Sequence, residues 1–346
     1  MTDVADETTA RVGVTASPAT SSPQASVTGR ASARPVAPAP GGRRGTGSAL
    51  RKRLEIAFFV APALLLFLFF VVVPIIRAVQ LSAYRWKGYG PLVDFVGLKN
   101  YVSVLQNDVF IGALQHNLIV VVASIAIQLP LGLAIALLLN RKMWGQGVLR
   151  TIIFVPYVLA EVIAGLAFKL LLQPNGAVNA ALDAVGLGAL TRNWLADPAI
   201  ALWTIFFILT WKYIGFAILL FLAGLQGVPD ELSEAAQIDG ATWWQVQRYI
   251  TLPLLAPTIR IWAFLSIIGS LQVFDMVWVT VSPTVRGIAT ETMATYMVQQ
   301  GQFAGQPGYG SAIAVILFVI SLVVALVYQR FALHRDLRGA ITGGVR

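Results

Sequence analysis

The chain contains no cysteine and only two histidines, His116 and His334, in 346 residues. Without cysteine there can be no disulfide, no catalytic thiolate and no cysteine-ligated metal site. Two imidazoles also leave little material for a histidine-based metal or acid–base centre. A Gly-x-x-x-x-Gly-Lys-Ser/Thr phosphate loop is missing as well, so we do not expect this chain to bind ATP itself.

Charge is equally scarce. Charged residues make up 12% of the chain, while 57% of its residues are hydrophobic, and soluble domains carry about 25% charged residues. One water-soluble core could not hide so much apolar surface, so most of it must face lipid. The net charge of +9 does not indicate nucleic-acid binding, because Lys and Arg gather at the ends of apolar runs rather than along one face.

Six stretches are long and apolar enough to cross about 30 Å of hydrocarbon as helices rising about 1.5 Å per residue. The sequence therefore predicts an all-α polytopic membrane protein. The six predicted spans are residues 56–76, 118–139, 150–172, 200–225, 259–281 and 312–333.

The distribution of Lys and Arg predicts the orientation of these spans. With the N-terminus inside the cell, cytoplasmic segments hold 17 of the 25 basic residues, as the positive-inside rule requires. Both termini are then cytoplasmic. The polar insertion at residues 229–258, between the fourth and fifth spans, lies on the same side.

The chain divides by composition into a membrane domain and two tails. Residues 1–50 are rich in Ala, Ser, Thr, Pro, Gly and Arg without apolar periodicity, so we expect a disordered cytoplasmic tail. The membrane domain covers residues 51–335 and includes the insertion. A short cytoplasmic tail follows at residues 336–346.

The insertion at 229–258 is predicted to form two short helices that meet at a corner. Pro229 suits the first turn of the first helix, and Gly240 can adopt the left-handed conformation that ends it. Thr242 and Gln245 have the spacing of a capping box at the start of the second helix. Pro253 is expected to end that helix and return the chain to the membrane.

Seven positions of this insertion form a spaced pattern of Glu-Ala-Ala, three residues, Gly, nine residues and Ile-x-Leu-Pro. They are Glu234, Ala235, Ala236, Gly240, Ile250, Leu252 and Pro253. The pattern resembles the loop by which permease subunits of bacterial binding-protein-dependent ATP-binding-cassette importers dock onto their ATPases. The carbohydrate-uptake group, with maltose-type and glycerol-phosphate-type members, is the most similar. The resemblance extends over residues 55–335, but Ser282–Gly287 departs from the Gly-Gly-Pro turn that the family often has there, which leaves the path of residues 282–311 open.

The resemblance implies a function and a set of partners. It implies a six-span, non-catalytic subunit of the bacterial plasma membrane that imports a sugar through a cavity shared with a second, non-identical permease. A dimer of ATPases would bind ATP and Mg²⁺ and would contact the loop, including Asp239. An extracytoplasmic sugar-binding protein, lipid-anchored or soluble, would deliver the cargo, with no cofactor on this chain and no nucleic acid among its partners.

Alignment from the loop implies a set of residues along the substrate path in the fourth and fifth spans. These are Trp211, Tyr213, Phe216, Ser266, Gly269, Ser270 and Gln272. Aromatic faces stack on the apolar faces of sugars, and hydroxyl and amide groups bond sugar hydroxyls. The competing interpretation is that Ser266 and Ser270, one helical turn apart, are small residues that let helices pack closely.

Two other interpretations remain open. Glu161, Lys212 and Asp275 could serve a proton-coupled secondary transporter, although no inverted duplication supports that class. The insertion could also be a membrane-surface helical hairpin anchored by Trp243 and Trp244 without a partner. The sequence does not identify the sugar, and a glycerol-phosphate-type cargo stays possible because Lys212 could serve an anion.

Overall fold

The computed structural model describes residues 46–141 and 144–330. Most of the N-terminal tail and the whole C-terminal tail predicted above therefore lie outside the described residues. The chain divides into two compact units, Met1–Ala61 and Pro62–Arg346. The described part of the first unit is the beginning of helix α1 (Thr46–Phe67), so residues 46–50, assigned above to the tail, are helical.

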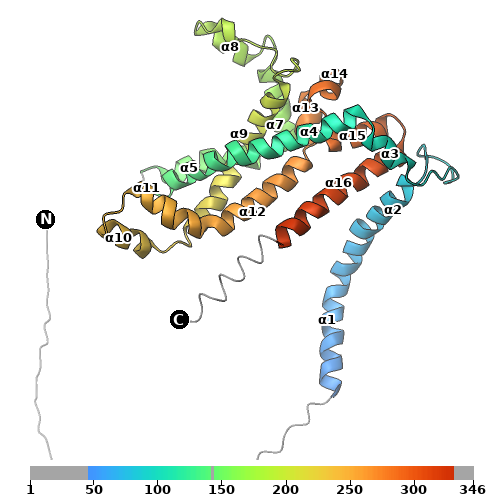
Figure 1. Cartoon of the computed structure of the whole chain (residues 1–346), viewed down its shortest axis with the longest axis horizontal. Coiled ribbons are helices and arrows are strands. Elements are labelled where there is room, and N and C mark those ends of the chain that lie inside the picture. The colour runs from blue at the N-terminus through green and yellow to red at the C-terminus, as the bar shows by residue number, and fades with distance from the viewer. Residues whose placement is uncertain (1–45, 142–143, 331–346) are drawn as a thin grey trace, which may run out of the picture. The chain divides into compact units, whose positions relative to one another are not determined.

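The second unit is built from helices (Figure 1). Among the described residues, extended pairing is limited to one isolated bridge between Tyr84 and Phe95. The α-helices after α1 are α2 (Val73–Ser82), α3 (Lys99–Leu105), α4 (Asp108–Ala123), α5 (Leu129–Leu139), α6 (Gln146–Val158), α7 (Glu161–Leu171), α8 (Ala177–Ala184), α9 (Ala201–Leu225), α10 (Asp230–Ile238), α11 (Trp243–Val246), α12 (Leu252–Leu271), α13 (Asp275–Thr280), α14 (Pro283–Val285), α15 (Met293–Val298) and α16 (Pro307–Tyr328).

Three spans contain a short π-helical segment, and each such segment lies just ahead of a proline. The segments cover residues 68–72, 124–128 and 247–251, and the prolines are Pro74, Pro130 and Pro253. A proline lacks the N–H of the regular helix and its ring clashes with the carbonyl four residues back. Widening the preceding turn relieves that clash without breaking the helix. The prediction that Pro253 ends its helix is therefore wrong, since the helix runs from Trp243 to Leu271.

Within residues 46–141 and 144–330, five helices are long and apolar enough to cross a membrane, or six if one bent pair counts as a single span. The bent pair is α6 and α7, which meet at 96°. The prediction of one uninterrupted helix over 150–172 is therefore wrong. Leu159 and Ala160 adopt extended backbone at the break. The predicted fifth span is also too long, because α12 ends at Leu271 and the shorter α13 follows.

Helix α9 is the centre of the second unit. More than half of its most apolar window is buried, and α5, α6 and α12 pack against it. The contact with α6 is close at Gly215, where an added Cβ would lie 2.3 Å from the carbonyl oxygen of Ile153. Glycine at 215 thus sets the separation of the two helices that carry the aromatic wall described below.

The connection between α12 and α16, whose path the sequence left open, is folded around a buried ion pair. Arg286 Nε lies 3.8 Å from Glu291 Oε2, with both side chains about 5% exposed or less. The guanidinium lies 3.9 Å from the centre of the Trp278 ring and donates to Gln299. Burial raises the pKa of Glu291 and lowers the pKa of Arg286, and their mutual attraction opposes both shifts.

The buried amide of Asn117 in α4 ties this connection to the end of α12. Its Nδ2 donates to the carbonyl oxygens of Ser270, at 2.7 Å, and Leu271, at 3.3 Å. The backbone N–H of Met293 donates to its Oδ1 at 2.9 Å. The last carbonyls of a helix lack intrahelical partners, so Asn117 caps α12 where it faces the cavity described below.

We expect Gly215→Ala to destabilise the protein, because its Cβ would be driven into the backbone of α6. Overpacking of this kind costs about 1–3 kcal/mol. Gly112→Ala in α4 is the matched control, since a Cβ there meets nothing within 4 Å and alanine favours the helix. Apparent melting temperatures in detergent should fall for Gly215→Ala and hold or rise for Gly112→Ala. Equal melting temperatures would contradict the packing described.

We expect Asn117→Asp to destabilise the protein although it preserves side-chain shape. It replaces a donor with a carboxyl oxygen facing two carbonyl oxygens, at a cost of at least about 2 kcal/mol. Gln106→Glu, an exposed amide-to-acid change just before α4, supplies the control. The same thermal measurement checks this, and an unchanged melting temperature for Asn117→Asp would show that the cap is dispensable.

Candidate functional site

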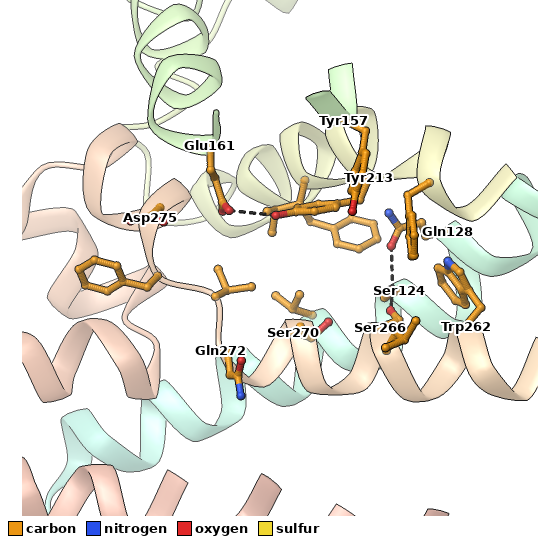
Figure 2. A pocket seen from close by; sticks show the side chains of 18 residues that line it. Ser124, Gln128, Tyr157, Glu161, Tyr213, Trp262, Ser266, Ser270, Gln272 and Asp275 are labelled. Atoms are coloured by element: carbon orange, nitrogen blue, oxygen red, sulfur yellow. Dashed lines mark hydrogen bonds between the residues drawn. The ribbon is translucent and has the colours of Figure 1, made fainter. Parts of the chain in front are cut away.

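A cavity of about 350 Å³ opens between α4, α6, α7, α9, α12 and the start of α13 (Figure 2). Eighteen residues line it. They include an aromatic wall from α6 and α9, a polar cluster from the second span and α12, and two carboxyl side chains.

The aromatic wall consists of Tyr157, Tyr213 and Phe216. The rings of Tyr157 and Phe216 are stacked, with centres 5.1 Å apart and planes 18° from parallel. Tyr213 meets Tyr157 edge to face at 6.1 Å. Tyr157, on the last turn of α6 before the break, was not predicted from the sequence. The packing of α6 against α9 brings it to this wall.

The polar cluster joins the second span to α12. Ser124 donates to the side-chain oxygen of Gln128 at 2.8 Å and shares a short hydrogen bond with Ser266 (Figure 2). Ser124 and Gln128, one turn apart in a π-helical segment, were also missed. Their signal was available, because polar residues inside an apolar span commonly line a cavity.

The carboxyl groups belong to Glu161, the first residue of α7, and Asp275, the first residue of α13. Glu161 Oε2 accepts a hydrogen bond from the Tyr213 hydroxyl at 2.9 Å (Figure 2). Both acids therefore start a helix, where the helix dipole favours negative charge.

Lys212 lies outside the cavity lining. Its ammonium donates to the backbone oxygens of Tyr157, at 3.3 Å, and Leu159, and the side chain is almost wholly buried. These are the free carbonyls at the end of α6, so the lysine serves as the cap of a broken helix. Of the groups named for a proton-coupled transporter, Lys212 donates to backbone carbonyls and Glu161 accepts a hydrogen bond from Tyr213.

Six of the seven side chains or positions predicted for the substrate path line this cavity. They are Tyr213, Phe216, Ser266, Gly269, Ser270 and Gln272. Figure 2 shows the Gln272 amide directed away from Glu161. Trp211 lies elsewhere and packs edge to face on Phe168, with ring centres 4.9 Å apart. Two residues along a helix turn the side chain by about 200°, so Trp211 and Tyr213 cannot share one face of α9.

The second candidate site is the insertion, in which α10 and α11 meet at Gly240. Gly240 has a φ of +85°, in the left-handed region, and Asp230 and Glu231 lie in the first turn of α10. The predicted capping box is present, with Thr242 and Gln245 satisfying each other's backbone N–H groups. The corner predicted from the sequence is confirmed, apart from the continuation of the second helix through Pro253.

This insertion presents unusual apolar surface. Ile238 is 86% exposed, Tyr249 74% and Trp244 66%. Trp243 is in contact with Arg141, whose guanidinium lies 4.8 Å from the centre of the indole ring. Exposed apolar residues in such number at a polar loop indicate a surface that another protein covers.

The motif residues occupy two parts of the insertion. Glu234, Ala235, Asp239 and Gly240 are exposed, and Ala236 is partly buried, on or just after α10. Ile250, Leu252 and Pro253 lie within the continuous helix that leads from α11 into α12.

Comparison with known proteins identifies the family of the chain. Residues 128–336 match the family model described as "Binding-protein-dependent transport system inner membrane component". The chain is 33% identical over 280 residues to the lactose transport system permease protein LacF of Rhizobium radiobacter, which covers 80% of this chain and 93% of LacF.

Two crystal structures have a similar fold. A bacterial ABC transporter involved in the import of the acidic polysaccharide alginate matches 83% of this chain and 99% of its own, with 25% identity and a TM-score of 0.72. A bacterial alginate ABC transporter in complex with an alginate pentasaccharide-bound periplasmic protein matches 83% and 96%, with 26% identity and a TM-score of 0.72. The chain belongs to the family of inner-membrane permease components of binding-protein-dependent transport systems, which are non-catalytic.

Proposed function

We propose that this chain is the permease subunit of an ATP-driven importer that moves a mono- or oligosaccharide across the bacterial plasma membrane. The exposed corner formed by α10 and α11 carries this proposal, because it has the full motif spacing, free apolar side chains and a helix that continues into the cavity wall. The relatives supply the substrate class, since LacF is named for lactose and the structural neighbours import alginate.

The loop is proposed to sit in a groove of an ATPase subunit on the cytoplasmic side, with both termini of the permease on that side. A dimer of such ATPases would bind ATP and Mg²⁺, and this chain would hold neither. Closure of the dimer would push on the corner and reorient the attached helices. The small side chains of Ala235 and Ala236 would let the partner approach α10 closely, while Trp244 and Ile238 supply apolar contact area.

The cavity is proposed to form part of the sugar path, completed by a second, non-identical permease. Tyr157 and Phe216 would stack on the apolar face of a sugar ring. The hydroxyl groups of Ser266 and Ser270 would exchange hydrogen bonds with sugar hydroxyls. An extracytoplasmic binding protein would load this path, in keeping with the periplasmic protein present in one structural neighbour.

The proton-coupled alternative is not favoured. It leaves the exposed corner without a role, and family membership assigns the chain to a binding-protein-dependent system. A hairpin lying on the membrane surface would likewise have no need of the spaced motif.

Glu234→Lys should uncouple ATP hydrolysis from uptake. A reversed charge at a docked interface costs more than about 1.4 kcal/mol, so uptake in proteoliposomes holding the complete importer should fall at least about tenfold. ATP hydrolysis by the ATPase subunits should remain. Gln106→Lys, which introduces a lysine at an exposed position outside the insertion, should transport normally. Unimpaired uptake by Glu234→Lys would contradict the proposed role.

Gly240→Pro tests the corner itself. Proline cannot adopt the φ of +85° found at Gly240, so α10 should lose its angle to α11 and coupling should fail as in Glu234→Lys. Gly240→Asn is the matched control, because asparagine tolerates the left-handed region. Membrane insertion of both variants is checked by yield and by melting temperature. Equal uptake by the proline and asparagine variants would show that the corner's geometry does not transmit work.

A further inference from the structure

The cavity is lined by two ionisable acids and by no Lys, Arg or His. Glu161 and Asp275 are the charged members of the eighteen lining residues of the described chain. Glu161 is partly buried and Asp275 is exposed. The remaining polar contributions come from hydroxyl and amide groups, which carry no net charge.

The nearest basic side chain is turned away from this space. Lys212 is directed at the backbone oxygens of Tyr157 and Leu159, and its ammonium also lies 5.4 Å from the centre of the Tyr213 ring. Its positive charge also attracts the carboxyl group of Glu161. Because it lies behind Tyr157 and Tyr213, the lysine makes the electrostatic potential in the cavity less negative. It does not offer an anion a direct contact.

The Tyr213 hydroxyl donates to Glu161 at 2.9 Å and fixes the carboxyl group at the edge of the cavity. The cavity walls are apolar helices, and in such surroundings charges act over longer distances than in water. An anion entering the cavity would therefore meet the two acids directly, while Lys212 offsets their charge only from behind the wall.

Resting on the import role proposed above, we infer that Glu161 and Asp275 make this subunit's part of the path exclude anions, so that the cargo is an uncharged or amino-bearing saccharide. A uronic-acid oligosaccharide or a sugar phosphate would be repelled. The cargo class thus differs from that of the structural neighbours, one of which imports an acidic polysaccharide. The glycerol-phosphate-type cargo, left open while Lys212 was free to serve an anion, loses its supporting residue.

The absence of cysteine from the chain allows a direct test. Gly269 lines the cavity, and a Cβ added there meets nothing within 4 Å. Gly269→Cys therefore places a single thiol in the cavity. The complete importer, with its partner permease made cysteine-free, is exposed to two thiosulfonate reagents of similar size, one carrying a trimethylammonium group and one a sulfonate. The two modification rates are measured by counter-labelling the remaining thiol.

For each thiol we take the modification rate of the cationic reagent divided by that of the anionic reagent. We expect this ratio to exceed the ratio for a small thiol in solution by about tenfold. The ratio should fall towards that reference when Glu161→Gln and Asp275→Asn are added together. Each single neutralisation should produce part of the fall, so the test survives if the double variant does not fold. Gln272→Cys, at a second exposed position on the lining, is an independent reporter.

A ratio at or below the reference at both positions would overturn the inference, as would a ratio that the neutralised variants leave unchanged. Failure of both thiols to react would overturn it as well, because the cavity would then not be an aqueous path. The measurement needs neither cargo nor ATP. A ratio that overturns the inference would leave the proposed import role unaffected. Normal coupled uptake tests that role separately, and its loss with an unchanged modification-rate ratio would count against the import role but not against the exclusion of anions.

Discussion

The buried ammonium of Lys212 is the constraint around which the centre of this protein is arranged. A charged group inside an apolar bundle must find polar partners, because neither lipid nor packed side chains can replace water. The partners here are backbone oxygens at the end of α6, which are free because the helix stops at Val158. The lysine and the break stabilise each other. Glu161 begins a new helix after this break.

The sequence predicted those parts of the fold that follow from local composition. Apolar length located the membrane helices, and α9 begins one residue from its predicted start. Turn and capping chemistry located the corner at Gly240 and the capping box at Thr242. The failures share a cause. The carbonyl oxygens at the break are bound by Lys212, which lies more than fifty residues away, and apolar composition does not reveal such a distant partner. Pro253 was misjudged because a π-helical turn absorbs its missing N–H.

The sequence could predict those cavity residues whose positions follow from spacing along a single helix. Tyr213, Phe216, Ser266 and Ser270 were named from family spacing along α9 and α12. Tyr157, by contrast, reaches the cavity through tertiary packing between separate helices, set in part by Gly215. A linear motif does not distinguish the two faces of a helix, and Trp211 lies outside the lining of this cavity, where its ring packs on Phe168.

The continuity of α11 with α12 gives the proposed coupling a simple mechanical basis. Trp243 begins a helix that reaches Leu271 without a break, and Ser266 and Ser270 of the cavity lie near its far end. At about 1.5 Å per residue the separation of Trp243 and Ser266 is about 35 Å. A helix of this length transmits tilt and translation, so a push at the corner would move the polar face of the cavity against the aromatic wall of α6 and α9. The π-helical turn at residues 247–251 lets Pro253 lie within this lever. Had Pro253 ended the helix, the corner and the cavity would have been joined by a flexible segment that absorbs the displacement.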